Sequence, residues 1–251
     1  MKKILTTYIL FWILKTATAQ APAYSSLNGH SHNDYAQKRP FVTAFEARMG
    51  SIEADVFLVN DTLFVAHDHK DIKPKRTLEN LYLKPLAAAI EAGKNYPLQF
   101  LIDIKTDADS TLRAIVRDIA QYPIIYNQNS LINIVISGNR PKPMVWLNYP
   151  NYIQFDGRPT ETYMPEQGQR IGLMSANYKQ YESEKEKKIT NPIVFQKMKT
   201  MVETAHKQGK KVRFWGTADT KKEWKRLMAL GVDFINTDVP NKLKRFLGRQ
   251  K

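Results

Sequence analysis

The sequence predicts a single-domain α/β protein, a (β/α)₈ TIM barrel of somewhat irregular form. Apolar, β-branched runs recur along the whole chain, and segments with helical apolar spacing separate many of them. No Gly/Ser-rich linker divides the chain. Strands that alternate with helices favour a parallel sheet, and eight candidate strands suggest that this sheet closes into a barrel.

The N-terminal residues have the order of a secretory signal. Two lysines near the start precede an apolar stretch over residues 4–14, and small residues then lead to Ala19. The apolar stretch is too short to span a bilayer. We therefore expect residues 1–19 to be a signal peptide, with residues 20–251 as the barrel domain of a periplasmic or secreted protein. A buried first helix is the alternative. The absence of cysteine is compatible with export.

Charge narrows the range of partners. The formal net charge is +14, and it falls to +11 without residues 1–19, which hold three lysines and no acidic residue. Such a chain suits phosphate-bearing metabolites, lipid phosphodiesters or peripheral contact with an anionic membrane surface, although the charge could serve solubility alone. No helix-turn-helix, zinc-finger or RRM signature accompanies it, so we do not expect nucleic acid as a partner.

The first half of the chain alternates strands and helices as a barrel requires. We place strands at residues 26–30, 51–59, 98–105 and 131–137. Helical apolar spacing marks residues 78–93 and 110–121. A short extended run, TLFV, lies between the second strand and the first helix.

The second half continues the alternation less regularly. We place strands at residues 151–156, 170–176, 211–216 and 232–236. Helices are predicted at 191–209 and 220–231, and glycines at the ends of such segments are typical of helix C-termini. Residues 139–150 and 157–169 have the composition of loops, and 181–188 that of a solvated loop, so the barrel is expected to be irregular.

Two carboxylates on the second strand carry the first functional signal. Glu53 and Asp55 are two residues apart, so they share one face of the strand, which is the barrel interior if Ile52, Ala54 and Val56 pack outward. Carboxylates on a buried face repel each other unless a cation lies between them. A hard divalent ion, Ca²⁺ or Mg²⁺, would meet this need. Pairing with lysines or arginines is the alternative.

The next strand supplies a matching pair. Asp103 and Lys105 share one face at the end of the strongly apolar run LQFLIDIK. Asp103 would be a third oxygen ligand for the ion and would leave positions open for substrate oxygens. Lys105 would then bind a phosphate oxygen or screen the carboxylates. An internal salt bridge between the two is the alternative.

The histidines favour proton chemistry over metal binding. His30 and His32 share a face of the first strand, and His67 follows the run TLFV. Barrels that bind metal through His-x-His on the first strand need further histidine ligands, and the second half of this chain supplies only His206, on a predicted helix. Carboxylates hold a hard metal without such help. We therefore interpret His30 and His67 as the acid/base pair and His32 as a substrate contact or supporting residue.

Together these motifs resemble the PLC-like phosphodiesterase superfamily, which includes glycerophosphodiester phosphodiesterases and phosphatidylinositol-specific phospholipases C. The resemblance covers residues 28 to about 245 and consists of His30, AF (44–45), IEADV (52–56), HD (67–68), IDIK (102–105), FWG (214–216) and GVDFINTDVP (231–240). The sequences HSHNDY (30–35), RTLENLYLKPL (76–86) and FDGR (155–158) are similar to the branch that includes the fungal altered inheritance of mitochondria protein six.

The resemblance implies a phosphodiesterase barrel with two catalytic histidines, a divalent cation on the three carboxylates and a lysine, Lys105, that faces the phosphate. Glycerophosphodiesterases have Arg-Gly after the first histidine, whereas this chain has Ser31 and His32. That arginine pairs with the substrate phosphate, so Arg158 or Arg39 is expected to supply the charge here.

We therefore expect an exported, metal-dependent phosphoric diester hydrolase that acts on glycerophosphodiesters or phospholipid headgroups. One histidine would take a proton from the attacking hydroxyl and the other would protonate the leaving alkoxide. Trp215, at the end of strand 211–216, could wall the pocket or pack in the core. The alternatives are a non-catalytic exported binding protein on the same barrel and a phospholipase D-like lyase.

Overall fold

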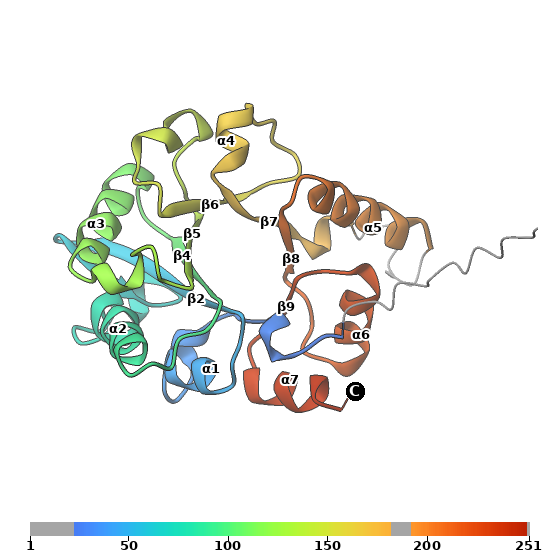
Figure 1. Cartoon of the computed structure of the whole chain (residues 1–251), viewed down its shortest axis with the longest axis horizontal. Coiled ribbons are helices and arrows are strands. Elements are labelled where there is room, and N and C mark those ends of the chain that lie inside the picture. The colour runs from blue at the N-terminus through green and yellow to red at the C-terminus, as the bar shows by residue number, and fades with distance from the viewer. Residues whose placement is uncertain (1–22, 182–191, 250–251) are drawn as a thin grey trace, which may run out of the picture.

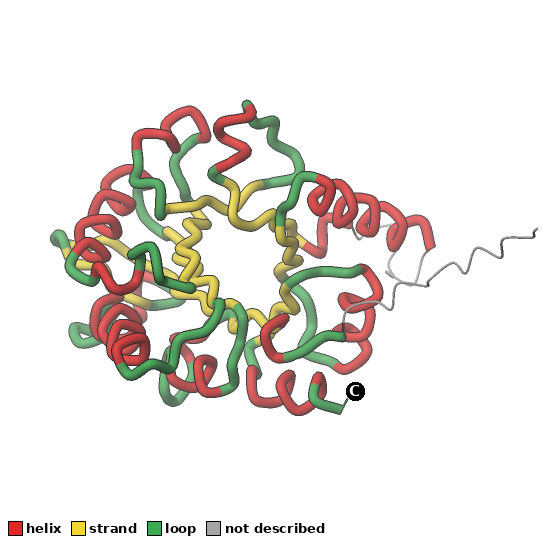
Figure 2. Tube along the Cα trace, viewed as in Figure 1, coloured by secondary structure: helices red, strands yellow, loops and turns green. Residues whose placement is uncertain are grey.

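Eight parallel strands close into a barrel in the computed structural model, which describes residues 23–181 and 192–249 (Figures 1 and 2). These strands are β1 (Gly29–Ser31), β2 (Ser51–Val59), β4 (Leu98–Ile104), β5 (Ile132–Gly138), β6 (Ile153–Gly157), β7 (Ile171–Asn177), β8 (Lys211–Trp215) and β9 (Phe234–Thr237). β1 pairs with both β9 and β2, and this pairing closes the barrel. The predicted TIM barrel is confirmed.

Helices surround the barrel on its outer side (Figure 1). They are α1 (Val42–Glu46), α2 (Lys84–Glu91), α3 (Ala108–Ala120), α4 (Pro165–Gln169), α5 (Pro192–Lys207), α6 (Lys221–Leu230) and α7 (Pro240–Leu247). Side-chain caps fix the starts of α3 and α6, where Asp107 accepts from Ser110 N and Thr220 accepts from Glu223 N. Within residues 23–181 and 192–249, no helix has the length and apolar character needed to cross a membrane.

The structure corrects several predicted boundaries. The first strand starts at Gly29, because residues Ser26–Asn28 form a 3₁₀ turn that the Ser25 side chain caps. The predicted helix at 78–93 divides into a π-helical turn, Glu79–Leu83, and α2. Pro85 lies at this junction and has no backbone N–H to donate to a regular helical ladder.

Some elements were not predicted. These are the short helices α1 and α7. The predicted extended run TLFV is strand β3 (Thr62–Val65), but its antiparallel pairing with β2, beside the barrel, was not predicted. The predicted loops 139–150 and 157–169 hold only a 3₁₀ helix, Pro143–Asn148, and the five-residue α4, so the expected irregularity is confirmed. The predicted signal peptide, and the predicted loop 181–188 apart from Tyr181, lie outside the described residues.

A small apolar layer fills the barrel below its mouth. It consists of Leu101, Val135, Leu173 and Phe234, all buried. The larger core lies between the outer faces of the strands and the helices. Two residues beyond each member of the small layer, on the same face of the same strand, stands a polar residue: Asp103, Ser137, Ser175 and Asn236. The apolar layer therefore forms the floor of a polar site at the carboxyl ends of the strands.

Candidate active site

Three carboxylates converge at the mouth of the barrel. Asp55 of β2 lies directly opposite Asp103 of β4 in the parallel register, and Glu53 precedes Asp55 by one full strand repeat. One oxygen from each of the three lies within 4.8 Å of the others. The predicted convergence of Glu53, Asp55 and Asp103 is therefore observed, and the cluster has the oxygen donors that a hard divalent cation prefers.

Two basic side chains pair with the same carboxylates. Lys105 Nζ lies 3.0 Å from Asp55 Oδ2 and 3.1 Å from Asp103 Oδ1, and Arg213 Nη1 lies 2.5 Å from Glu53 Oε2. The ion pairs considered as an alternative to metal binding are thus also present. Two cations beside three carboxylates leave the cluster with excess negative charge, which favours a further cation.

Burial and mutual repulsion shift the pKa values of the carboxylates in this cluster. Burial raises the pKa of Asp55 to about 7, repulsion from Glu53 adds to the rise, and Lys105 opposes it. Burial alone would also raise the pKa of Glu53, but Arg213 and His30 hold it well below its usual range. Asp55 is therefore the carboxylate that is hardest to keep ionised without a further cation.

Space around Asp103 depends on a glycine of the neighbouring strand. Gly138, which ends β5, has a φ of +69°. A Cβ at this position would overlap Asp103 Oδ1 and the carbonyl oxygen of Ile104. The chain thus keeps open the volume beside one carboxylate of the cluster, and the residues present fit a bound divalent ion.

His30 is buried at one side of the cluster. Its Nδ1 lies 2.7 Å from Ser51 Oγ, and its Nε2 lies 2.6 Å from Glu53 Oε2 and also contacts Arg213 Nη1. Burial, with Arg213 as the second cause, lowers the pKa of His30 to about 4 against the opposing effect of Glu53. The imidazole is therefore neutral at pH 7.

His67 borders the cluster at another carboxylate. It follows the β2–β3 hairpin, and its side chain is 65% exposed. Its Nδ1 lies 3.9 Å from Asp55 Oδ2 and 3.1 Å from the hydroxyl of Tyr35, which itself lies 2.9 Å from Asp55 Oδ2. His30 and His67 thus approach the cluster at Glu53 and at Asp55, respectively.

A polar cavity of about 390 Å³ opens beside the carboxylates. The lining residues are His32, Glu53, Asp103, Ile104, Lys105, Ser137, Gly138, Asn139, Arg158, Arg213 and Trp215. His32 Nδ1 lies 2.7 Å from Asp238 Oδ1, so His32 joins the wall without joining the carboxylate cluster. Trp215 is 38% exposed and is therefore a wall of the cavity and not a core residue.

The two arginines considered for the phosphate differ in position. Arg158 lines the cavity, and its Nη1 donates to Asp156 Oδ2 at 2.7 Å. Arg39 pairs with Glu46 on the surface and is not among the cavity residues. Arg158, and not Arg39, is therefore placed to supply positive charge to the site.

Sequence reasoning missed several residues of the site. Arg213 shares the inward face of β8 with the terminal Trp215, two residues on, so the alternation that marked the carboxylates applied to it as well. Tyr35, which contacts Asp55, comes from a 3₁₀ turn without a periodic pattern. Asp156 is buried and accepts hydrogen bonds from serines of the two flanking strands, and no local signal indicated that role.

Two family models match parts of the chain. The model of the AIM6-like phosphodiesterase domain matches residues 23–97, and that of the glycerophosphoryl diester phosphodiesterase family matches residues 211–241. The two matches contain the strand ends that carry His30, Glu53, Asp55, His67 and Arg213.

One relative and two solved structures cover most of the chain. The altered inheritance of mitochondria protein 6 homolog of Arthroderma benhamiae is 26% identical over 86% of this chain and 82% of its own length. The crystal structure of a glycerophosphodiester phosphodiesterase from Parabacteroides distasonis superposes with a TM-score of 0.59 at 19% identity, covering 90% of this chain and 96% of that one.

The second structure is a Ca²⁺-dependent phosphatidylinositol-specific phospholipase C from Streptomyces antibioticus. It superposes with a TM-score of 0.54 at 11% identity and covers 86% of this chain and 94% of that one. At such identities both structures support the fold. The resemblance predicted from the sequence is confirmed: the chain is similar to the PLC-like phosphodiesterase superfamily, and within it to the AIM6-like branch.

Proposed function

We propose that the chain is an exported, metal-dependent phosphoric diester hydrolase that uses two histidines for acid/base catalysis. The convergence of Glu53, Asp55 and Asp103 at the barrel mouth, with His30 and His67 each close to one of these carboxylates, carries the proposal. The matches to two phosphodiesterase family models support the reaction class. Substrates are glycerophosphodiesters or phospholipids cleaved at the headgroup.

The positive side chains of the cavity bind the substrate phosphate. Lys105 and Arg158 both line the cavity and present cationic nitrogens to it, and His32 and Trp215 contact the rest of the substrate. Arg213 keeps Glu53 ionised. A divalent ion, Ca²⁺ or Mg²⁺, held by the three carboxylates would stabilise charge on the phosphoryl oxygens.

The two histidines move the protons. One accepts a proton from the attacking hydroxyl, which belongs to water or to the substrate, and the other protonates the leaving alkoxide. Because each histidine lies near a different carboxylate of the cluster, a phosphate bound between them would have one on each side. Each transfer contributes about 10²- to 10⁴-fold to the rate.

A screen of phosphodiesters with and without Ca²⁺ or Mg²⁺ tests the reaction class. A linear monoester product indicates attack by water, and a cyclic phosphate indicates attack by a hydroxyl of the substrate. A cyclic product that is not hydrolysed further would favour the alternative of a phospholipase D-like lyase. No turnover of any diester would favour the alternative of a binding protein on the same barrel.

Substitution of the histidines tests the mechanism. We expect His30→Ala and His67→Ala each to lower turnover, and the double variant to lose far less than the product of the single losses. His69→Ala is the matched control, because His69 is exposed and lies two residues from His67. On a substrate with a good leaving group only the acid becomes dispensable, so one single variant should recover and the other should not. Equal, unrescued losses with loss of bound metal would contradict the assignment.

Export is a separate part of the proposal, based on the N-terminal sequence. The mature protein should begin at Gln20 if cleavage follows Ala19. N-terminal sequencing of the protein recovered outside the cytoplasm checks this, and an intact N-terminus there would contradict it.

A further inference from the structure

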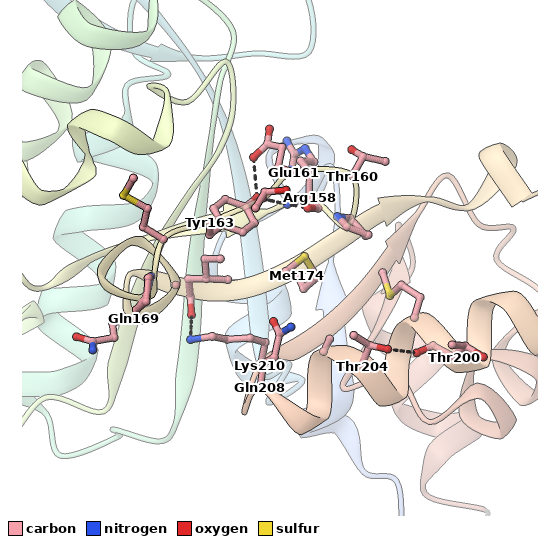
Figure 3. A pocket seen from close by; sticks show the side chains of 18 of the residues that line it. Arg158, Thr160, Glu161, Tyr163, Gln169, Met174, Thr200, Thr204, Gln208 and Lys210 are labelled. Atoms are coloured by element: carbon pink, nitrogen blue, oxygen red, sulfur yellow. Dashed lines mark hydrogen bonds between the residues drawn. The ribbon is translucent and has the colours of Figure 1, made fainter.

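A groove of about 920 Å³ lies on the outer wall of the barrel, between α4 and α5 and over β7 (Figure 3). Tyr163 and Gln169 line one side, Thr200 and Thr204 of α5 line the other, and Met174 of β7 lies between them. Helix α4 has only five residues, whereas α5 has 16. The groove therefore occupies space beside the strands that a longer fourth helix would fill.

Three polar side chains of the groove have partners within the protein. The Tyr163 hydroxyl donates to Glu161 Oε2 at 2.6 Å, the Thr204 hydroxyl donates to a carbonyl of its own helix at 2.8 Å, and Lys210 Nζ donates to the Ile171 carbonyl at 3.1 Å. The wall also holds Gln169, Thr200 and Gln208, but most of the surface that it offers to a ligand is apolar. This surface comes from Met164, Ile171, Met174, Tyr181, Met201 and Ala205.

Methionines give the groove an adaptable lining. Met164 is 66% exposed, and Met174 and Met201 lie deeper. Unbranched thioether side chains adjust to ligands of irregular or flexible shape. An exposed apolar surface of this kind, next to a polar cavity, is typical of a binding site for an apolar group.

The groove meets the cavity at the barrel mouth. Arg158 lines both, and it is fixed by its hydrogen bond to Asp156. The cavity on one side of Arg158 contains Lys105 and Arg213, and the groove on the other side is mainly apolar. A molecule with its phosphate at Arg158 could thus place one substituent in a polar environment and the other in an apolar one.

We propose that this groove binds one hydrocarbon chain of a lipid phosphodiester whose phosphate lies in the cavity at Arg158. The inference rests on the proposed function, because that function places the phosphate there. Each methylene that leaves water should tighten binding by about fourfold until the groove is full. The substrate class is therefore a phospholipid or lysophospholipid and not a water-soluble glycerophosphodiester.

Gly168 offers a direct way to close the groove. It lies in α4 and lines the groove, and a Cβ at this position would meet no atom within 4 Å. A large side chain can therefore enter the open space without displacing the wall. Gly168→Trp is the test variant and Gly168→Ala is the matched control, because both replace the same helical glycine but only the indole is large enough to occupy the groove.

Calorimetric titration of the full mature protein with ethyl phosphate and with dodecyl phosphate, below its micelle concentration, measures the effect. The wild type and Gly168→Ala should bind dodecyl phosphate at least about a hundredfold more tightly than ethyl phosphate. Gly168→Trp should bind both with the affinity of ethyl phosphate. Met201→Glu, on the opposite wall, should act in the same way and serves if Gly168→Trp lowers the melting temperature.

The other outcomes separate this inference from the proposed function. Equal affinity of the wild type for the two phosphates overturns the inference. A change of oligomeric state in Gly168→Trp with unchanged binding would assign the groove to a second copy of the chain and also overturns it. Hydrolysis of short-chain diesters at a rate that does not depend on chain length would support the proposed hydrolase and contradict lipid binding in the groove. Binding of dodecyl phosphate that Gly168→Trp weakens, without hydrolysis of any diester, would support lipid binding in the groove and contradict the proposed hydrolase.

Discussion

Replacement of Gly138 by alanine should disable the carboxylate cluster without changing any of its members. The residue has a φ of +69°, and an added Cβ would overlap both Asp103 Oδ1 and the carbonyl oxygen of Ile104. The Ile104 oxygen belongs to the backbone of β4 and cannot rotate away, so either the strand or the Asp103 side chain must shift. Asp103 would then leave the position that it shares with Asp55 and Lys105.

The expected loss of stability has two parts. An L-residue in the left-handed region costs about 1–2 kcal/mol, and forcing an extra carbon into a filled volume costs about 1–3 kcal/mol more. Gly93→Ala isolates the first part, because Gly93 has the same φ of +69° but a Cβ there would meet nothing within 4 Å. In a chain of this size each kcal/mol lowers the melting temperature by about 2–4 °C.

Thermal unfolding and metal titration together test this reasoning. Gly138→Ala should melt below Gly93→Ala, and it should bind Ca²⁺ or Mg²⁺ about 10- to 100-fold more weakly than Gly93→Ala, as when a supporting contact of a ligand is lost. Metal affinity of Gly93→Ala should equal that of the wild type. Equal metal affinities of the two variants, measured by calorimetry, would refute the role of Gly138 in holding Asp103 at an ion site.

Two further predictions concern the charges around the cluster. Arg213→Met leaves the buried Glu53 without its guanidinium partner and should lower the free energy of unfolding, measured in urea, by about 3–5 kcal/mol. Arg39→Met breaks an exposed ion pair and should lower it by less than about 1 kcal/mol. Similar losses in the two variants would contradict this prediction. Burial lowers the pKa of His32, but its hydrogen bond to Asp238 and the charge of Glu53 outweigh burial and raise that pKa above 6.5. The folded state therefore holds this proton more tightly than the unfolded state. The free energy of unfolding of the wild type should therefore exceed that of His32→Gln fully below pH 6.5, and the difference should vanish as the pH rises through the raised pKa. A difference that does not vary with pH would contradict this. Loss of metal binding in His32→Gln would contradict the placement of His32 outside the carboxylate cluster.

The spacing of apolar residues predicted the fold well, because the barrel repeats the same strand and helix patterns along the chain. The run SIEADVFLV gave β2 with the same bounds, since alternate residues of this strand must satisfy the outer core and the barrel interior at once. The first strand was misplaced by three residues at its start, because the Ser25 cap and the turn after it have no periodic signal. Short helices such as α1 likewise depend on their packing partners and not on a long apolar repeat.

The site residues that could be predicted from the sequence are those that share one face of the same strand. Glu53 and Asp55 are linked by alternation alone, and the parallel register then brings Asp103 level with Asp55. Arg213 escaped prediction because its partner, Glu53, lies on a strand 160 residues earlier in the chain. The groove next to Arg158 was equally out of reach, because it results from the shortness of α4 relative to α5.

The two histidines of the site lie on parts of the chain that are paired differently. His30 belongs to a strand of the closed barrel, whereas His67 follows the β2–β3 hairpin. His30 belongs to β1, which is paired on both sides within the closed ring of strands, so its backbone can open only when the ring itself opens. His67 follows β3, which lies beside the ring and is joined to β2 by four cross-strand residue pairs. Local openings of such elements need less free energy than global unfolding. We therefore expect amide exchange to be faster along β3 than along β1. His67 can then leave and rejoin the site while the carboxylate cluster stays folded.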